Sequence, residues 1–215
     1  MASGRKKAVW DRSIKARERL GLSFKSMYKG RHFIAMDTRI DKGVSVGGFS
    51  REAIVVDFDK SPSLQRLYNE ILLRCRVSGK FARNLFLGKL YGLVDETFQQ
   101  RSDEYVEQLV NSLNVPDDYK VSLDFFVENH AGVCRHMALT AGVVTERLAD
   151  NRYLRGKVSV DRNEVKGHGA HEWVRYTSSS GRVLIIDVAR GFCGTLEDSA
   201  KLANSWPYQR KGDLV

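Results

Sequence analysis

Cys134 is of a type, and in a position, that could start nucleophilic catalysis. It follows Gly132-Val133 and opens an Ala- and Leu-rich segment with helical spacing. A thiol at the first turn of a helix meets free backbone N–H groups and the positive end of the helix dipole, and both favour the thiolate. A thiolate attacks a carbonyl carbon, and an N–H of the same turn can bind the resulting oxyanion. Cys134 is therefore a candidate nucleophile; the alternative is a cysteine that only packs at a helix start.

His171 and Asp187 are the candidate general base and the group that orients it. A cysteine nucleophile needs a base to take its proton, and the base needs a carboxylate or amide to hold its ring. His171 opens an alternating segment, Asp187 ends an apolar run, and Ser178-Ser179-Ser180-Gly181 lies between them, which predicts a β-hairpin. A turn centred between Ser179 and Ser180 would pair His171 with about residue 188, so we expect His171 and Asp187 to be neighbours or near-neighbours, joined by an Nδ1–H to carboxylate hydrogen bond. A register shift of one residue would turn one of them to the opposite face.

The elements that must position these residues are predicted from periodicity and turn residues. Helical spacing of apolar residues appears before Cys134, and strand-like alternation follows the helix that Cys134 begins. This order, helices first and then an antiparallel sheet, indicates an α+β fold. The expected helices are 8–20, one starting at Ser61-Pro62, 81–99, 103–113, a short one capped by Ser122, and 133–149; the expected strands are 53–56, 158–160, 171–176 and 183–188.

Other residues near the candidate nucleophile have weaker assignments. Asn129 and His130 lie just before the cysteine and are candidates for an oxyanion donor, although Asn129 is equally suited to capping a loop. Trp173 is expected to pack on the sheet beside the site. His168 would replace His171 as the base if the register were shifted. His136 points away from a thiol two positions earlier on a helix, so we expect it to anchor the helix.

At this point the motifs resemble those of the transglutaminase-like superfamily, over about residues 120–195. The shared elements are Gly132-Val133-Cys134-Arg135-His136, Gly169-Ala170-His171-Glu172-Trp173-Val174 and Leu184-Ile185-Ile186-Asp187, in that order. The resemblance implies a papain-like Cys–His–Asp active site on a helix packed against an antiparallel sheet. It also implies Cys134 as nucleophile, His171 as general base and acid, and Asp187 as orienter, with no cofactor.

The other cysteines favour a reducing compartment such as the cytoplasm. Cys75, Cys134 and Cys193 are odd in number and scattered, which does not suit a disulfide framework. Cys75 is expected to be buried at a helix end, and Cys193 to fill space near the site, with a redox role toward Cys134 as the alternative. A zinc site made by Cys134, His136, His168 and Cys193 would have suitable ligand types but poor spacing, so no metal is expected.

The net charge of +9 is concentrated at the N-terminus. Residues 1–31 hold ten basic and two acidic side chains, which leaves residues 32–215 near neutral. We therefore expect a basic arm, 1–31, able to contact an anionic partner, and one domain, 32–215, with a helical part at about 60–130 and a catalytic core at about 130–195. No apolar run approaches the length that spans a bilayer.

Two functions follow from the sequence. The first is an enzyme that transfers an acyl group from an amide or peptide bond of a protein or peptide substrate through a thioester on Cys134. Peptidase, glutamine deamidase and cross-linking activities would share this chemistry, and hydrolysis is favoured because water needs no second site. The second is a module of the same fold that acts as an adaptor rather than a catalyst and binds an anionic partner through residues 1–31. A third possibility combines both, with residues 1–31 delivering the enzyme to its target, as in a secreted bacterial effector.

Overall fold

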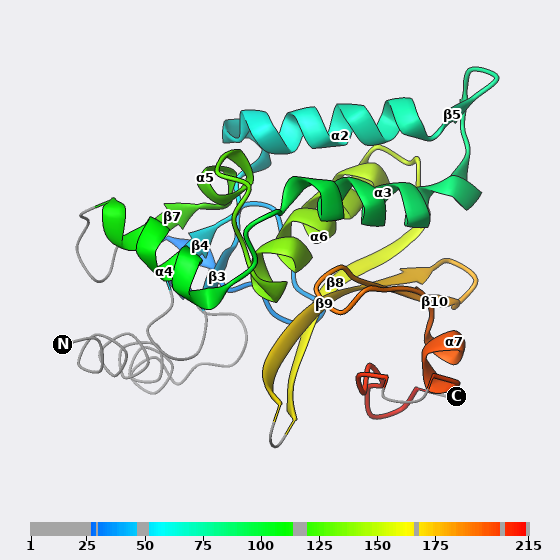
Figure 1. Ribbon diagram of the computed structural model, residues 1–215. Helices are drawn as coiled ribbons and strands as arrows, with labels where there is room; N and C mark the ends of the chain where they lie inside the picture. Colours follow the sequence, from blue (N-terminus) through cyan, green and yellow to red (C-terminus); the bar gives the residue numbers. More distant parts are fainter. Residues whose placement is uncertain are drawn as a thin grey trace.

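The computed structural model describes residues 27–28, 30–46, 52–113, 120–165, 168–202 and 205–213, and they form a mixed helix and sheet structure (Figure 1). The helices are η1 (Phe58–Lys60), α2 (Pro62–Arg74), α3 (Arg83–Thr97), α4 (Asp103–Ser112), α5 (Leu123–Glu128), α6 (Cys134–Asp150) and α7 (Leu196–Ala200). The strands are β1 (Met27–Tyr28), β2 (Arg31–His32), β3 (Val44–Val46), β4 (Ala53–Val55), β5 (Arg76–Val77), β6 (Lys80–Phe81), β7 (Lys120–Ser122), β8 (Gly156–Val165), β9 (Gly169–Ser178), β10 (Val183–Asp187) and β11 (Phe192–Thr195).

Helix α6 is the centre of the molecule. It lies between α2 and α3 on one side and the four-stranded antiparallel sheet β11-β10-β9-β8 on the other (Figure 1). Its contact with the sheet is close: a Cβ added at Gly142 would lie 3.0 Å from Val160 of β8 and 3.6 Å from Val174 of β9. Thirteen of its 17 residues are buried. A helix apolar on nearly every side must be enclosed by other elements, which explains why the helical layer and the sheet both pack on it.

The register of β9 against β10 decides which residues share a face of the sheet. Val183 pairs with Thr177 and Ile186 with Val174, so Asp187 continues the ladder opposite Trp173. His171 lies two residues before Trp173, on the same face. This register differs by one residue from the expected one, in which His171 would lie opposite Val188 and Asp187 opposite Glu172. In the expected register His171 and Asp187 would be near-neighbours on opposite faces of the sheet, whereas the observed register puts them on the same face.

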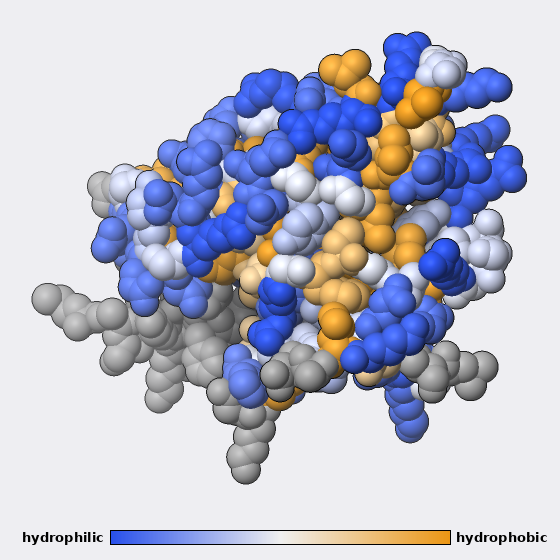
Figure 2. Space-filling model, turned by 45° about the vertical axis from the view of Figure 1, so that its right-hand side comes forward, coloured by the Kyte–Doolittle hydropathy of each residue, from blue (hydrophilic) through white to orange (hydrophobic). Residues whose placement is uncertain are grey.

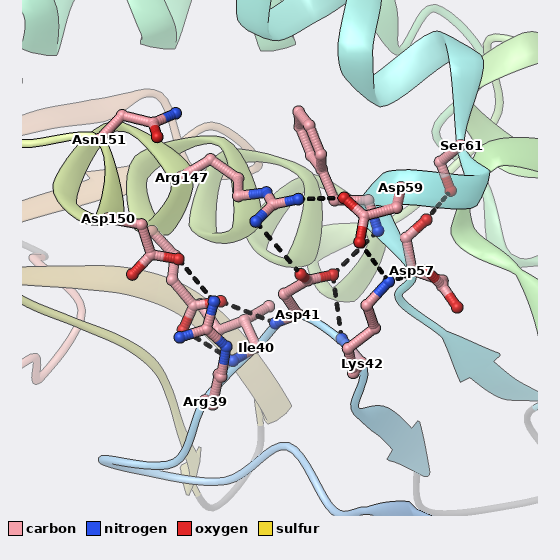
Figure 3. A network of polar contacts seen from close by, with 12 residues as sticks. Arg39, Ile40, Asp41, Lys42, Asp57, Asp59, Ser61, Arg147, Asp150 and Asn151 are labelled. Atoms are coloured by element: carbon pink, nitrogen blue, oxygen red, sulfur yellow. Dashed lines mark hydrogen bonds and ion pairs between the residues drawn. The ribbon is translucent and has the colours of Figure 1, made fainter.

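Two N-terminal stretches, residues 39–42 and 57–61, are bound to α6 by a polar network (Figure 3). The buried carboxylate of Glu146 accepts the backbone N–H groups of Ile40 at 2.9 Å and Asp41 at 2.7 Å. Arg147 bonds Asp59, and Arg39 bonds Asp150 at 2.5 Å. These contacts fix the approach of the two stretches to the helix that carries Cys134.

Most of the expected elements are confirmed within the described residues. Pro62 is the first residue of α2, Ser122 accepts the N–H of Asp124 at 3.3 Å as the cap of α5, and α6 starts one residue later than expected. The short strand expected at 158–160 was wrong in extent, because β8 pairs with β9 along its whole length of ten residues. Strand β11 and helix α7 were not predicted, and the expected helix 8–20 lies outside the described residues.

The expected end of the basic arm at residue 31 falls inside a β-hairpin. Met27 pairs with His32 and Tyr28 with Arg31. The Arg31 guanidinium bonds Asp57 at 2.8 Å, which ties this hairpin to the rest of the fold. Residues 1–26 lie outside the described part of the chain.

Among the described helices, none combines the length and the apolar character that crossing a membrane requires.

Candidate active site

Cys134 is the first residue of α6 and its side chain is partly exposed. The loop before it is held by two hydrogen bonds across to the end of α3: Gly132 N–H donates to Gln100 O at 2.9 Å, and Gln100 N–H donates to His130 O at 3.0 Å. Glycine is required at position 132, where a Cβ would lie 2.7 Å from the Phe98 ring. The loop therefore brings the cysteine to the helix start in a fixed geometry, with solvent access.

His171 and Asp187 are joined by a short hydrogen bond. The Nε2 of His171 lies 2.6 Å from Oδ2 of Asp187, and only 7% of the His171 surface and 1% of the Asp187 surface are exposed. His171 and Asp187 are thus in contact as expected, but the ring uses Nε2 and not the expected Nδ1. Asp187 also accepts the Arg190 backbone N–H at 3.1 Å through its other oxygen.

The environment of His171 favours its protonated form. Burial lowers the pKa of the ring, but the interactions with Asp187 and with the Cys134 thiol outweigh it and raise the pKa from 6.5 to about 9. The ring is thus an imidazolium at neutral pH, between a carboxylate and a sulfur. The structure therefore brings Cys134, His171 and Asp187 together from α6, β9 and β10.

A C-terminal segment, residues 205–213, supplies two aromatic side chains to this group. The Tyr208 hydroxyl donates to Oδ2 of Asp187 at 2.8 Å, the same oxygen that His171 binds. The Trp206 ring meets the His171 ring edge-on at 4.9 Å between centroids, with Arg190 over its other side at 4.6 Å. Asp187 and His171 are thus shielded from water by residues near the end of the chain.

The C-terminal segment is tied to the sheet at both ends. Trp206 Nε1 donates to the Asn163 side chain at 2.6 Å. Arg210 binds Asp161 at 2.7 Å, and Asp213 binds Arg175 at 2.9 Å. These partly or fully buried pairs hold the segment in place, so the position of Tyr208 does not depend on its single hydrogen bond.

A second buried cluster lies under the first turn of α6. Arg135 and His136 both bind the carboxylate of Glu52, with His136 Nε2 at 3.1 Å. Burial raises the pKa of Glu52, but the two partners overcome it and lower the pKa to about 2. His136 Nδ1 also accepts the Val133 N–H at 3.2 Å. The expected role of His136 in anchoring the helix is confirmed, whereas Glu52 was not predicted because nothing in its local sequence marks it.

The expected oxyanion candidates are engaged elsewhere. The Asn129 amide donates to Phe125 O at 2.8 Å and ends α5, which is the capping alternative. His130 Nδ1 lies 2.9 Å from Thr97 O. Neither side chain is directed by these contacts toward Cys134, so nothing in these contacts supports the oxyanion assignment.

Trp173 and His168 also have defined positions. Trp173 is 3% exposed and packs with Ile185, Trp206 and Tyr208, which confirms the packing role. Its Nε1 is buried without a hydrogen-bond partner among the described residues. His168 is exposed and lies 6.4 Å from the Trp206 ring, between centroids, while Asp187 binds His171. His168 therefore does not take the place of His171 beside Asp187.

The other two cysteines are held as thiols. Cys75 is fully buried at the end of α2, and burial raises its pKa. The Cys193 thiol donates to Leu87 O at 3.5 Å, and burial raises its pKa to about 11. A protonated thiol is a poor nucleophile and a poor metal ligand. Within the described residues, no cluster of three or more His, Cys, Asp or Glu side chains is arranged to bind a metal, so the zinc alternative is not formed.

Tyr208 and Trp206, which contact Asp187 and His171, were not predicted from the sequence. Trp206-Pro207-Tyr208 is an aromatic-rich tripeptide in a segment without periodicity, and no spacing rule connects it to His171 or Asp187.

The arrangement as a whole can hold a sulfur anion next to a protonated imidazole and deliver that proton to a leaving group. Comparison of the chain with protein-family models, curated proteins and solved structures finds no match, so this chemistry rests on the geometry.

Proposed function

We propose that this protein is a cysteine-dependent acyl-transfer enzyme that acts on an amide or peptide bond, with a core similar to that of the transglutaminase-like superfamily. The observation that carries the proposal is the position of His171. Its Nε2 is engaged by Asp187 at 2.6 Å, which leaves Nδ1 for the Cys134 thiol, and both interactions raise its pKa. This is the arrangement that cysteine nucleophiles use.

The reaction follows from these positions. The Cys134 sulfur attacks the carbonyl carbon and forms a tetrahedral oxyanion, which backbone N–H groups at the start of α6 are suited to bind. The His171 imidazolium then gives its proton to the leaving nitrogen, the C–N bond breaks, and an amine departs from a thioester on Cys134. Water, deprotonated by the now neutral His171, attacks the thioester and releases a carboxylic acid and the thiol. If an amine replaced water, a new amide would form instead.

Asp187 and its partners have supporting roles in this proposal. Asp187 stabilises the imidazolium and fixes the ring, as the orienting group of a triad does. Tyr208 and Arg190 fix the carboxylate in turn, through its two oxygens. Trp206 keeps water from the hydrogen bond between His171 and Asp187, and exclusion of water strengthens that bond.

Labelling with a thiol-directed electrophile tests the nucleophile. At pH 7 and limiting iodoacetamide, we expect Cys134 to react first, because Cys75 and Cys193 are held as thiols by burial. Peptide mapping by mass spectrometry identifies the labelled residue, and Cys134→Ala should abolish rapid labelling, whereas Cys193→Ala should leave it unchanged. Faster labelling of Cys75 or Cys193 in the folded protein would refute the assignment.

Trapping of the acyl-enzyme tests the reaction class. We expect the protein to form an adduct on Cys134 when it is incubated with a mixture of peptides of random sequence and peptides that contain glutamine. The adduct is seen as a mass increase and should be absent in His171→Ala. Release of the peptide acid in the absence of added amine would support hydrolysis. Formation of an amide with an added lysine analogue, without release of the acid, would instead support cross-linking.

A further inference from the structure

The end of the molecule opposite the candidate site is strongly basic, although residues 32–215 together are nearly neutral. Three stretches of sequence, 71–94, 151–160 and 174–186, contain five, three and two Lys or Arg residues and no Asp or Glu. The remaining residues from 32 to 215 carry 15 basic and 24 acidic side chains. The charge of this part of the chain is therefore segregated, not balanced.

The fold brings the three stretches together. The Phe81 and Tyr153 rings pack at 5.2 Å between centroids, and Arg83 Nε donates to Tyr153 O at 2.6 Å. Gly156 pairs with Ser178, which joins the second stretch to the end of β9. We call this region the basic end; it consists of residues 73–89 (the end of α2, the β5–β6 hairpin and the first half of α3), residues 151–157, and residues 175–182 (the end of β9 and the β9–β10 turn).

The cations of the basic end face solvent. Two of its ten cations are paired, Arg74 with Glu70 and Arg175 with Asp213. The other eight are exposed, and in the part of the chain that the structure describes none of them forms an ion pair; they are Arg76, Lys80, Arg83, Lys89, Arg152, Arg155, Lys157 and Arg182. Eight like charges without counter-charges repel one another, and an external anionic surface would relieve that repulsion.

Large apolar side chains project from the same region. Leu73 is 65% exposed, and Val77, beside the Ser78-Gly79 turn of the β5–β6 hairpin, is 51% exposed. Tyr153 is 36% exposed. The hairpin extends beyond α2 and α3 (Figure 1), and on the side of the molecule that carries it apolar side chains reach the surface among hydrophilic ones (Figure 2). The basic end thus combines cations with a protruding aliphatic tip.

We infer that the basic end docks on an anionic lipid bilayer. An acidic membrane surface attracts nearby cations, and aliphatic side chains gain free energy by entering the boundary of the acyl chains. Leu73 and Val77 offer nothing to a nucleic acid, which is bound through stacking aromatic rings and phosphate contacts. Among the described residues of the basic end, the exposed ring of Tyr153 already packs against Phe81. Aliphatic tip and cations together therefore favour lipid over nucleic acid.

The placement also leaves the candidate site accessible. Cys134 begins α6 and Arg152 lies two residues beyond its last residue, Asp150, so the two features are separated by about 25 Å of helix. The excess of acidic residues elsewhere would orient the molecule with its basic end toward the membrane. This inference is independent of the proposed enzymatic function.

Vesicle sedimentation tests the inference with the full chain. Vesicles of phosphatidylcholine with about 30% phosphatidylserine should bind the protein, and vesicles of phosphatidylcholine alone should not. The double variant Arg76→Glu/Lys80→Glu should reduce the partition coefficient at least about tenfold. Leu73→Ser/Val77→Ser should reduce it severalfold, mainly at high salt, where the electrostatic attraction is screened.

Matched variants away from the basic end serve as controls. Lys201→Glu/Lys211→Glu makes the same change of charge at exposed positions, and Leu202→Ser removes an apolar side chain that is 53% exposed. Both should bind as the unchanged protein does, and circular dichroism spectra should confirm that every variant is folded. Residues 1–31 remain intact in all of them, so binding through that basic arm would be unaffected by the two basic-end variants.

Three results would overturn the inference. One is binding that the Arg76→Glu/Lys80→Glu variant retains. Another is binding that Leu73→Ser/Val77→Ser leaves unchanged at every salt concentration. The third is binding of a fluorescent nucleic-acid duplex, sensitive to Arg76→Glu/Lys80→Glu, by a protein that does not bind the vesicles; this would identify nucleic acid as the partner.

Discussion

The candidate site at the start of α6 and the basic end beyond its last residue differ in how their charges are stabilised. At the N-terminal end of α6 Glu52, Asp187 and His171 are buried, and each has a charged or hydrogen-bonding partner within the fold. Beyond its C-terminal end, eight of the ten cations of the basic end are exposed and form no ion pair with another described residue. A buried charge left alone costs several kcal/mol, so internal partners are obligatory at the first end. At the second end water stabilises each cation, so these cations are free to meet an external partner.

The difference has a direct consequence for mutation. Removing one member of a buried group leaves its partner desolvated and unpaired. Removing an exposed cation leaves no buried partner behind and therefore costs the fold little. Substitutions near Cys134 should therefore have large effects on stability or reactivity, and comparable substitutions at the basic end should change only binding.

Asp187→Asn should have the largest effect. The amide keeps the shape of the side chain but cannot stabilise an imidazolium, and it favours the wrong tautomer of His171. Loss of the orienting carboxylate costs about 10⁴-fold in the rate of triad enzymes. We expect acyl-enzyme formation on Cys134 to fall by about that factor, measured by mass spectrometry. A rate within tenfold of the unchanged protein would remove Asp187 from the mechanism.

Glu52→Ala should destabilise the fold more than it affects the chemistry directly. It leaves Arg135 and His136 buried beneath the start of α6 without their carboxylate, at a cost of about 3–5 kcal/mol in the free energy of unfolding. Urea denaturation measures this cost. The pKa of about 2 also means that Glu52 stabilises the fold above its unfolded value of about 4.5, and that this contribution is lost as the pH falls toward 2.

Tyr208→Phe removes one hydrogen bond and keeps the packing of the C-terminal segment. Because the hydroxyl donates to a buried carboxylate, we expect a loss of about 1.5–3 kcal/mol in the free energy of unfolding. Labelling of Cys134 should slow far less than in Asp187→Asn. Unchanged stability would show that the hydrogen bond is not formed in solution.

The pKa of about 9 for His171 predicts how two reagents should compare across pH. An imidazolium beside the sulfur attracts the negatively charged iodoacetate more than neutral iodoacetamide. The ratio of the two alkylation rates at Cys134 should therefore stay high below pH 9 and fall severalfold above it. The raised pKa of His171 also stabilises the folded state. This contribution is complete below pH 6.5 and is lost as the pH rises through about 9. A constant ratio from pH 7 to 10 would contradict an imidazolium.

Arg155→Ser, at the basic end, should have the smallest effect on the fold. The side chain is exposed and has no ion pair with another described residue. We expect the free energy of unfolding to change by no more than about 0.5 kcal/mol. A loss above about 2 kcal/mol would show that this end depends on internal charge pairs as the N-terminal end of α6 does.

Periodicity was a good guide to the helices and to the hairpin that carries His171 and Asp187. It was a poor guide to β8, whose exposed and charged residues weaken the strand pattern, and to β11, which is only four residues long. The hairpin was expected, but its register came from the turn geometry and was one residue off. That single step decides whether Asp187 faces His171.

Local sequence determined where Cys134 sits, because a glycine and a run of helix-forming residues define the start of α6 through short-range forces. It also determined that His171 and Asp187 lie on adjacent strands. Only the tertiary structure decided which ring nitrogen meets Asp187, that Tyr208 and Trp206 complete its surroundings, and that cations from three separate stretches gather at one end. Contacts of this kind join residues far apart in the chain, and the free energy that selects them comes from packing and desolvation of the whole fold.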